Sequence, residues 1–278
     1  MSNKQAPASA QLISESISEI LAQGTRGVLA TVVESGASPL AVGAKLIAHE
    51  SGEKVGGLGD ATVDGAVAKQ GIAFLRSRDE AKTFYVRDFA PELTTFAETR
   101  ILFERIESEP RLVIAGAGHV GASLARIAAL VGFQVTLIDD RAEFVERELF
   151  SAQSEQGIDL IAADDWQAAM GRAIGSGRGV SVAIVTRGHK QDEECLRATI
   201  KARPDYVGMI GSKRRTNIVL EKLREEDASE NELQKVRAPI GLDIGAVSPE
   251  EVALAILAEI VAERRSGSGA PLSSWRRS

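Results

Sequence analysis

The sequence predicts an α/β protein in which a C-terminal Rossmann-type parallel sheet follows a smaller N-terminal α+β domain. The first observation is residues 111–140, where a buried-strand pattern, the glycine motif G-x-G-x-x-G at 116–121, a helical pattern and a second strand follow one another. The second is that strand and helix patterns keep alternating after residue 140, as in parallel sheets covered by helices. The third is a length of 278 residues with 44% hydrophobic residues, which suits two packed domains.

The domain boundary is expected just before the glycine motif. Pro110 cannot continue a strand ladder and therefore suits a short linker. We expect an N-terminal domain over residues 1–107 and a Rossmann-type nucleotide- or cofactor-binding domain over residues 108–265. Residues 266–278 are rich in glycine and serine and predict a flexible tail.

The N-terminal domain is expected to open with an amphipathic helix, whose apolar face runs from Leu12 to Leu21 and which ends near Gly24. Apolar runs bounded by turn-forming residues then predict five strands. These are residues 27–33, 44–48, 54–58, 82–86 and 100–106. A helix is expected over residues 63–75, and glycines crowd the junction that leads into it.

In the C-terminal domain, strands are expected on either side of the helix that follows the glycine motif. The expected strands are residues 112–115, 134–138, 180–186 and 206–210, with a weaker segment at 158–162 and a short run at 239–244. The expected later helices are residues 143–148, 166–174, 193–202 and 216–224. Ser248 and Glu251 form a capping box that starts a final apolar helix.

Composition argues against several classes of function. Lys and Arg total 33 against 39 Asp and Glu, and this net charge of −6 argues against a broad nucleic-acid surface. No apolar stretch reaches the length of a membrane span and the polar N-terminus lacks a signal pattern, so we expect a cytoplasmic protein. The single cysteine excludes an intramolecular disulfide, and with three histidines we expect no metal site. Cys195 is expected to be a buried helical thiol and not a nucleophile.

The three glycines of the motif have separate expected roles. Gly116 allows a tight turn, Gly118 lets the backbone approach a phosphate, and Gly121 lets the helix pack closely on the strand. Free N–H groups at the helix start suit an anion. His119 lies in this turn and either contacts the ligand or is an exposed first-turn side chain. The motif therefore predicts a dinucleotide site, a site for another phosphate-bearing ligand, or a turn kept for packing.

The acid at the end of the second strand bears on the choice of nucleotide. Asp139 lies eighteen residues after Gly121, where an acid would bond a ribose hydroxyl. It favours NAD over NADP, because it repels a 2′-phosphate. Arg141 complicates this choice, because it could accommodate that phosphate.

Polar residues after the later strands complete the candidate site, because ligands of open parallel sheets bind beyond the carboxyl ends of the strands. The candidates are Arg187, His189, Asp192, Gly211, Ser212, Lys213, Arg214 and Asp243. Ser212 could cap a helix whose first residues, with Arg215, are cations, and these either serve a bound phosphate or form a solvated face. His189 and Asp192 could orient one another for proton transfer, ligate a metal or be structural.

The chain resembles the XdhC/CoxI family of maturation factors for molybdenum hydroxylases. The motifs that carry the resemblance are SGASPLAVGAKL (35–46), GAGHVG (116–121), DDR (139–141), TRGHKQDEECL (186–196), YVGMIGSKRR (206–215) and PIGLDIGAVSPEEVALAILAEIVAERR (239–265). Ser38 and Lys45 match in the first of these. Where many members have Gly-Gly-Cys-x-Glu, this chain has residues 60–64, with Thr62 for the cysteine and Asp64 for the glutamate.

The resemblance implies a factor that binds molybdenum cofactor (molybdopterin), in its mononucleotide or dinucleotide form, and is not itself a catalyst. It would hold the cofactor while a cysteine desulfurase-type sulfurase adds the terminal sulfur, and then deliver it to an apo molybdenum hydroxylase. Ser38, Lys45, Thr62 and Asp64 are the implied cofactor contacts of the first domain, and we expect a homo-oligomer. Two alternatives stay open: an NAD(P)-dependent oxidoreductase, and a nucleotide-sensing regulatory module.

Overall fold

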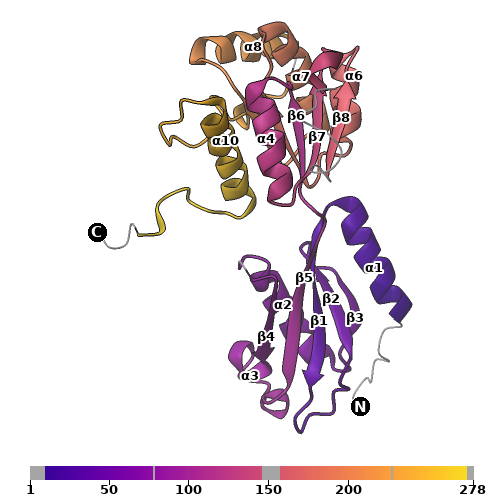
Figure 1. Cartoon of the computed structure of the whole chain (residues 1–278). Helices are drawn as coiled ribbons and strands as arrows, with labels where there is room; N and C mark the ends of the chain where they lie inside the picture. Colours follow the sequence, from indigo (N-terminus) through magenta and orange to yellow (C-terminus); the bar gives the residue numbers. More distant parts are fainter. Residues whose placement is uncertain (1–9, 78, 146–156, 227, 274–278) are drawn as a thin grey trace. The chain divides into compact units, whose positions relative to one another are not determined.

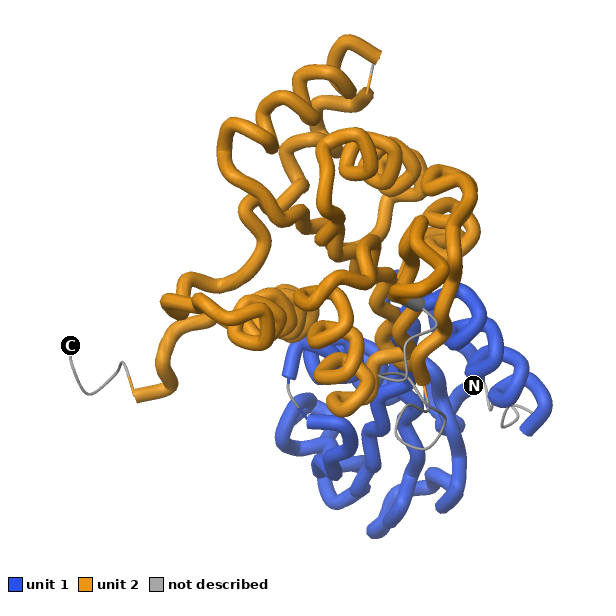
Figure 2. Tube along the Cα trace, turned by 45° about the horizontal axis from the view of Figure 1, so that its top comes forward, with its two compact units in different colours: residues 1–108 blue, residues 109–278 orange. Residues whose placement is uncertain are grey.

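The computed structural model describes residues 10–77, 79–145, 157–226 and 228–273. The chain divides into two compact units, residues 1–108 and 109–278, which Figure 2 draws in different colours. Each unit contains one five-stranded sheet and its own apolar core. The predicted fold class is confirmed, since the sheet of the second unit is parallel and that of the first is antiparallel.

Unit 1 is built on a sheet with the strand order β3-β2-β1-β5-β4 (Figure 1). All five predicted strands are present. They are β1 Arg26–Glu34, β2 Lys45–His49, β3 Lys54–Gly57, β4 Ala81–Tyr85 and β5 Arg100–Glu107. The central strand β1 pairs antiparallel with β2 and β5. Its apolar side chains alternate between the two faces, with Val28 in one core cluster and Leu29 against the other.

Two helices supply the apolar surfaces that bury this sheet. Helix α2, Ala61–Phe74, packs on the face that carries Leu46, and α1, Ala10–Gln23, packs on the face that carries Ile47. Successive residues of a strand point to opposite faces, so a run of buried residues in β2 requires a cover on both sides. These two helices explain why residues 44–48, from which the strand β2 was predicted, form a continuous apolar run.

Two details of unit 1 differ from the sequence predictions. Leu12 and Leu21 are 50% and 44% exposed, because they flank the narrower stripe of α1 that contacts the sheet. Between β4 and β5 lie two short helices, α3 Val86–Phe89 and η1 Thr94–Phe96, which were not predicted. Helices this short carry too few residues to display an amphipathic period.

Unit 2 is built on a parallel sheet with the strand order β10-β9-β6-β7-β8. The strands are β6 Arg111–Ala115, β7 Gln134–Asp139, β8 Ile158–Ala162, β9 Val180–Ile184 and β10 Tyr206–Met209. From β6 the chain adds β7 and β8 on one side and then β9 and β10 on the other. The order therefore changes direction between β6 and β9, which is the position where parallel sheets of this kind bind ligands.

Helices cover both faces of this sheet (Figure 1). On one side are α4 His119–Leu130 and α10 Pro249–Arg264, and on the other α6 Trp166–Ile174, α7 His189–Ala202 and α8 Lys213–Glu225. Ile114 of β6 packs with the first group and Val113 with the second. The predicted capping box at Ser248 starts α10. None of the helices in the described ranges combines the length and apolar character that crossing a membrane requires.

Several predicted elements of unit 2 need correction. Residues 239–244 are not a strand, because the N–H groups of Ile240, Gly241 and Leu242 bond to Met209, Glu259 and Ala255 instead of to one neighbouring strand. Helix α7 begins four residues earlier than predicted. Short helices α5, Ala142–Val145, and α9, Glu230–Gln234, complete the unit. Residues 146–148 of the helix predicted at 143–148 lie outside the described residues.

Two glycines bring the turn after β6 against neighbouring backbone. Gly116 has φ +111°, and a Cβ atom there would lie 2.7 Å from the carbonyl oxygen of Val185. Gly121 is the third residue of α4, and a Cβ atom there would overlap the carbonyl oxygen of Gly116. Strand β6, its turn, α4 and the segment after β9 are therefore packed main chain against main chain.

We predict that Gly121→Ala destabilises unit 2 by roughly 1–3 kcal/mol or more, because the added methyl group meets backbone that cannot rotate away. Gly65→Ala is the matched control, since Gly65 is also a helical glycine and its Cβ position meets open space. Alanine should stabilise α2 there by up to about 1 kcal/mol. Urea unfolding measures both, and equal stabilities for the two variants would contradict the packing argument.

Candidate functional site

Two helix N-termini open at the carboxyl ends of β6 and β9. Helix α4 begins after Gly118 and α7 after Gly188, and in the described part of the chain neither helix has a side-chain cap. The first N–H groups of a helix have no partner within the helix and favour an anion. The contact between Gly116 and Val185 brings the two turns together. The region beside these two helix starts, called the crevice below, is therefore a candidate phosphate site.

Gly118 differs from the other two glycines of the motif. No described atom lies within 4 Å of the position that a Cβ atom of Gly118 would occupy, whereas those of Gly116 and Gly121 would meet backbone. Its φ of −66° is also accessible to any residue. The described packing therefore does not require a glycine at this position, which is the N-cap of α4.

Asp139 fixes the glycine turn to the end of β7. Its carboxylate is 2% exposed and accepts the N–H of Ala117 at 2.7 Å, the N–H of Arg141 at 3.0 Å, and the Arg141 guanidinium at 2.8 and 3.0 Å. Burial alone would raise the pKa of Asp139, but these hydrogen bonds hold it below its usual value. All four acceptor positions of the carboxylate are used. Asp139 therefore positions the turn and is not free for a ribose hydroxyl as the sequence predicted.

The charged residues beside Asp139 are Arg141, which is partly buried, and Asp140 and Arg187, which pair at the surface. The Arg141 guanidinium stacks on the Phe144 ring, 3.4 Å from its centroid, while it bonds Asp139. Asp140 is exposed and accepts a hydrogen bond at 3.1 Å from Arg187, a predicted site residue whose side chain is 53% exposed. The sequence analysis did not single out Asp140, because the sequence does not show which of two consecutive acids has its side chain buried.

A buried network joins the turns after β9 and β10. Asp192 is fully buried and accepts hydrogen bonds from the Thr186 hydroxyl at 2.5 Å and from Arg215 Nε at 2.6 Å. Burial raises the pKa of Asp192, against the lowering effects of Thr186 and Arg215. His189 is exposed in the first turn of α7 and makes no hydrogen bond to Asp192, but its charge lowers the pKa of Asp192, so an exchange of a proton between them stays a prediction. Arg215 is a structural partner and not a free cation.

The other predicted residues of unit 2 lie at the surface. Ser212 caps α8, as predicted, by accepting the N–H of Arg215 at 3.3 Å, and Gly211 precedes it with φ +153°. Lys213 and Arg214 are exposed at the start of α8, and His119 is exposed at the start of α4. Asp243 is exposed in the loop before α10, and no described contact joins it to the crevice.

Two predicted residues of unit 1 belong to a turn and a strand. The Ser38 hydroxyl donates to the carbonyl of Ser35 at 2.8 Å and accepts from Thr99 at 2.8 Å. Lys45 donates to the Thr31 hydroxyl on the adjacent strand at 2.9 Å. Both side chains are half-buried and contribute to the local structure.

The other two predicted residues of unit 1, Thr62 and Asp64, lie in the first turn of α2. Asp60 caps this helix by accepting the N–H groups of Thr62 and Val63, and the Thr62 side chain is exposed. Asp64 is 4% exposed and accepts the N–H of Leu58 at 2.7 Å. Burial raises the pKa of Asp64. Asp64 therefore holds the glycine-rich junction in place, while Thr62 is accessible.

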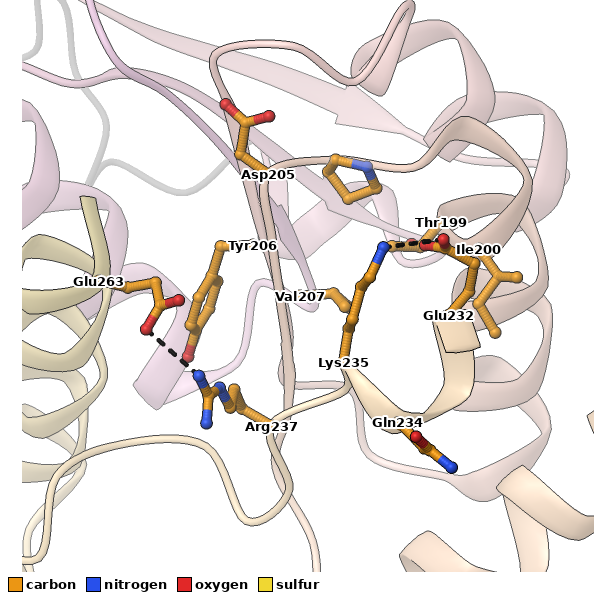
Figure 3. A pocket seen from close by; sticks show the side chains of 11 residues that line it. Thr199, Ile200, Asp205, Tyr206, Val207, Glu232, Gln234, Lys235, Arg237 and Glu263 are labelled. Atoms are coloured by element: carbon orange, nitrogen blue, oxygen red, sulfur yellow. Dashed lines mark hydrogen bonds and ion pairs between the residues drawn. The ribbon is translucent and has the colours of Figure 1, made fainter. Parts of the chain in front are cut away.

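The hollow drawn in Figure 3 lies elsewhere, at the amino end of β10. It is about 320 Å³ in volume, and ion pairs join Lys235 to Glu232 at 2.8 Å and Arg237 to Glu263 at 3.3 Å on its walls. None of the predicted site residues lines it. In the ranges that the structure describes, no three His, Cys, Asp or Glu side chains gather as metal ligands would.

Family models match both units of the chain. The model described as the XdhC Rossmann domain matches residues 112–260, and that described as the XdhC and CoxI family matches residues 20–86. The chain belongs to the XdhC and CoxI family. The resemblance identified from the sequence motifs is thereby confirmed.

Three relatives are similar to this XdhC/CoxI member over long segments. It is 29% identical over 252 residues to uncharacterized protein YqeB of Escherichia coli K12, covering 87% of this chain and 44% of that protein. It is 30% identical over 167 residues to a probable xanthine dehydrogenase subunit of Bacillus subtilis 168, covering 60% and 47%. It is 27% identical over 154 residues to molybdenum cofactor insertion chaperone PaoD of E. coli K12, covering 55% and 40%. The chain spans less than half the length of these relatives.

We predict that Asp139→Asn lowers the free energy of unfolding of unit 2 by about 2 kcal/mol, because the neutral amide weakens the bonds to Arg141 and cannot accept at both ends. Asp140→Asn, one residue away and exposed, should cost less than about 0.5 kcal/mol. The Asp139 contribution is present above pH ~4 and is lost as the pH falls through its lower folded pKa. Urea unfolding between pH 7 and 3 measures both variants. Equal losses for the two would contradict the assigned roles.

Proposed function

We propose that this protein is a maturation factor, which binds molybdenum cofactor and delivers it to an apo molybdenum hydroxylase of the xanthine or carbon monoxide dehydrogenase type. The observation that carries the proposal is the open space at Gly118 beside two helix N-termini without side-chain caps in the described chain, in a member of the XdhC and CoxI family. The similarity to a molybdenum cofactor insertion chaperone supports it.

The phosphate of the cofactor is the group that this crevice suits. Molybdopterin carries a phosphate, which the free N–H groups at the start of α4 would hold. Lys213 and Arg214 are exposed at the next helix start and add positive charge, although cations there oppose the helix dipole. Such cations are understandable if they serve a bound anion. The bound cofactor supplies the molybdenum centre, and the residues of this chain supply binding, orientation and protection.

The role proposed for unit 1 does not use a thiolate. Thr62 is exposed where many family members have cysteine, and its hydroxyl can hydrogen-bond an oxygen of the cofactor but cannot relay sulfur. Cys195 is fully buried in α7, and burial raises the pKa of its thiol well above the usual value. Sulfur would therefore come from a cysteine desulfurase-type sulfurase. Ser38, Lys45 and Asp64 would contribute mainly by fixing the backbone of unit 1 around Thr62.

The experiment is a titration of the purified protein with molybdenum cofactor, followed by transfer to an apo-hydroxylase. We predict that Gly118→Val abolishes binding and transfer while helix content is kept, because the branched side chain fills the space for the phosphate. Gly171→Val is the matched control, since its position on α6 also meets open space.

Unchanged cofactor affinity in Gly118→Val would reject the proposed site. Hydride transfer by the wild type with NADH or NADPH would instead support the oxidoreductase alternative. Nucleotide binding with neither transfer nor turnover would support the regulatory alternative.

We predict that the double variant Lys213→Gln, Arg214→Gln weakens cofactor binding and flattens its salt dependence, because part of the attraction is Coulombic and is screened over about 10 Å at 0.1 M salt. Arg215 is left intact, since it holds Asp192. The control is Arg172→Gln, Arg178→Gln, which removes the same charge from exposed positions distant from the carboxyl ends of the strands. Equal affinity and salt dependence in both double variants would show that Lys213 and Arg214 are only a solvated face.

A further inference from the structure

The outer face of α10, the helix beside α4 in Figure 1, is apolar although it lies at the surface. From residue 252 to residue 262 the sequence contains a single charged residue, Glu259. Its carboxylate is turned inward, where it accepts a hydrogen bond from the Tyr206 hydroxyl at 2.9 Å. Leu254 and Val261, on the opposite side of the helix, are 55% and 38% exposed. Helices that are apolar all round are normally covered all round, so this face of α10 suits a further protein surface.

The helices on the other face of the sheet have the pattern expected of a solvated surface. Glu193 and Arg197 of α7 pair at 2.7 Å, and Glu193 also pairs with Lys222 of α8 at 2.7 Å. Such charged side chains are typical of a helix face that meets water. The uncharged face of α10 is therefore a local feature and not a general property of the helices of unit 2.

The exposed face of α10 has an acid at one end and a base at the other. At about 100° per residue, five positions lie within one stripe about 80° wide. They are Glu250, Leu254, Ala258, Val261 and Arg265, the last being the C-cap, and we call them the α10 face. The helix dipole favours an acid at the start and a base at the end. It does not account for the uncharged stretch between them.

We propose that the α10 face is a contact surface between two copies of this chain, which pair antiparallel about a two-fold axis. With the axis near Ala258, Leu254 lies opposite Val261 of the second copy, and Glu250 lies opposite Arg265 of the second copy. The axis repeats each contact, so the face is complementary to itself in both charge and apolar character. A parallel pairing would bring like charges together. The small side chain of Ala258 lets the two helices approach closely where they cross.

The size of the α10 face predicts a weak dimer. Val247, directly before the helix cap Ser248, is 87% exposed and adds apolar surface at the start of each α10. Even so, one helix from each copy makes a small interface, of the class that forms transient complexes. We therefore expect a dissociation constant on the order of micromolar, so that monomer and dimer coexist at ordinary protein concentrations.

The first test is sedimentation equilibrium of the full chain at roughly 1–100 µM, which brackets such an equilibrium. The double variant Leu254→Glu, Val261→Glu should weaken the dimer at least about hundredfold, because four carboxylates would be buried at the interface. Ile218→Glu is the control, since Ile218 is 51% exposed on α8, across the sheet, and should leave the dissociation constant unchanged. Urea unfolding of each variant verifies that the fold is kept.

The second test exchanges the charges of the pair. Glu250→Arg should weaken the dimer about tenfold, because it places like charges opposite each other twice. Adding Arg265→Glu should restore the wild-type dissociation constant, since both pairs then form with their roles reversed. Glu221→Arg, at an exposed position of α8, is the control for the charge change.

A wild-type protein that is monomeric over the whole concentration range would overturn the proposal. A dimer that withstands Leu254→Glu, Val261→Glu would also overturn it, because its interface would then lie elsewhere. Failure of Arg265→Glu to rescue Glu250→Arg would reject the antiparallel pairing.

Discussion

The close approach of main chain to main chain at Gly116 and Gly121 is the constraint on which unit 2 depends. A Cβ atom at either residue would meet the backbone of Val185 or of the turn itself. Because no side chain separates them, the ends of β6 and β9 and the start of α4 lie at the distance of direct backbone contact. The start of α4 therefore lies at the position where the strand order changes direction.

Two buried carboxylates hold the loops around this contact. Asp139 ties the loop after β7 to the glycine turn, and Asp192 ties the loop after β9 to Arg215 at the start of α8. A buried charge with a full set of hydrogen bonds is a rigid support, since breaking one partner leaves the other uncompensated. The charges of Asp140, Arg187, Lys213 and Arg214 lie at the surface instead, where Asp140 and Arg187 pair with one another.

The sequence was sufficient to predict the fold class and the strands of both sheets, because both faces of each sheet are covered and the strands read as apolar runs. It failed at residues 239–244, where apolar residues cross from β10 to α10 and each N–H group finds a separate partner.

At the site, residue type and spacing located the loops but not the direction of a side chain. Asp192 and Arg215 were each left with a structural and a ligand-binding reading, and the structure shows that they bond one another. The turn at Gly188 repeats the strand-glycine-helix pattern, a signal that could have identified a second open helix start.

The position of Asp139 and Asp140 at the end of one strand has a consequence for engineering. Asp139 is the last residue of β7 and Asp140 the first residue after it, so identical side chains come to occupy the interior and the surface. The stability of unit 2 and the charge of its surface are thus set by adjacent residues and can be varied separately. A library confined to residue 140 would vary the surface charge on an unaltered scaffold, whereas one that included residue 139 would consist mostly of destabilised proteins.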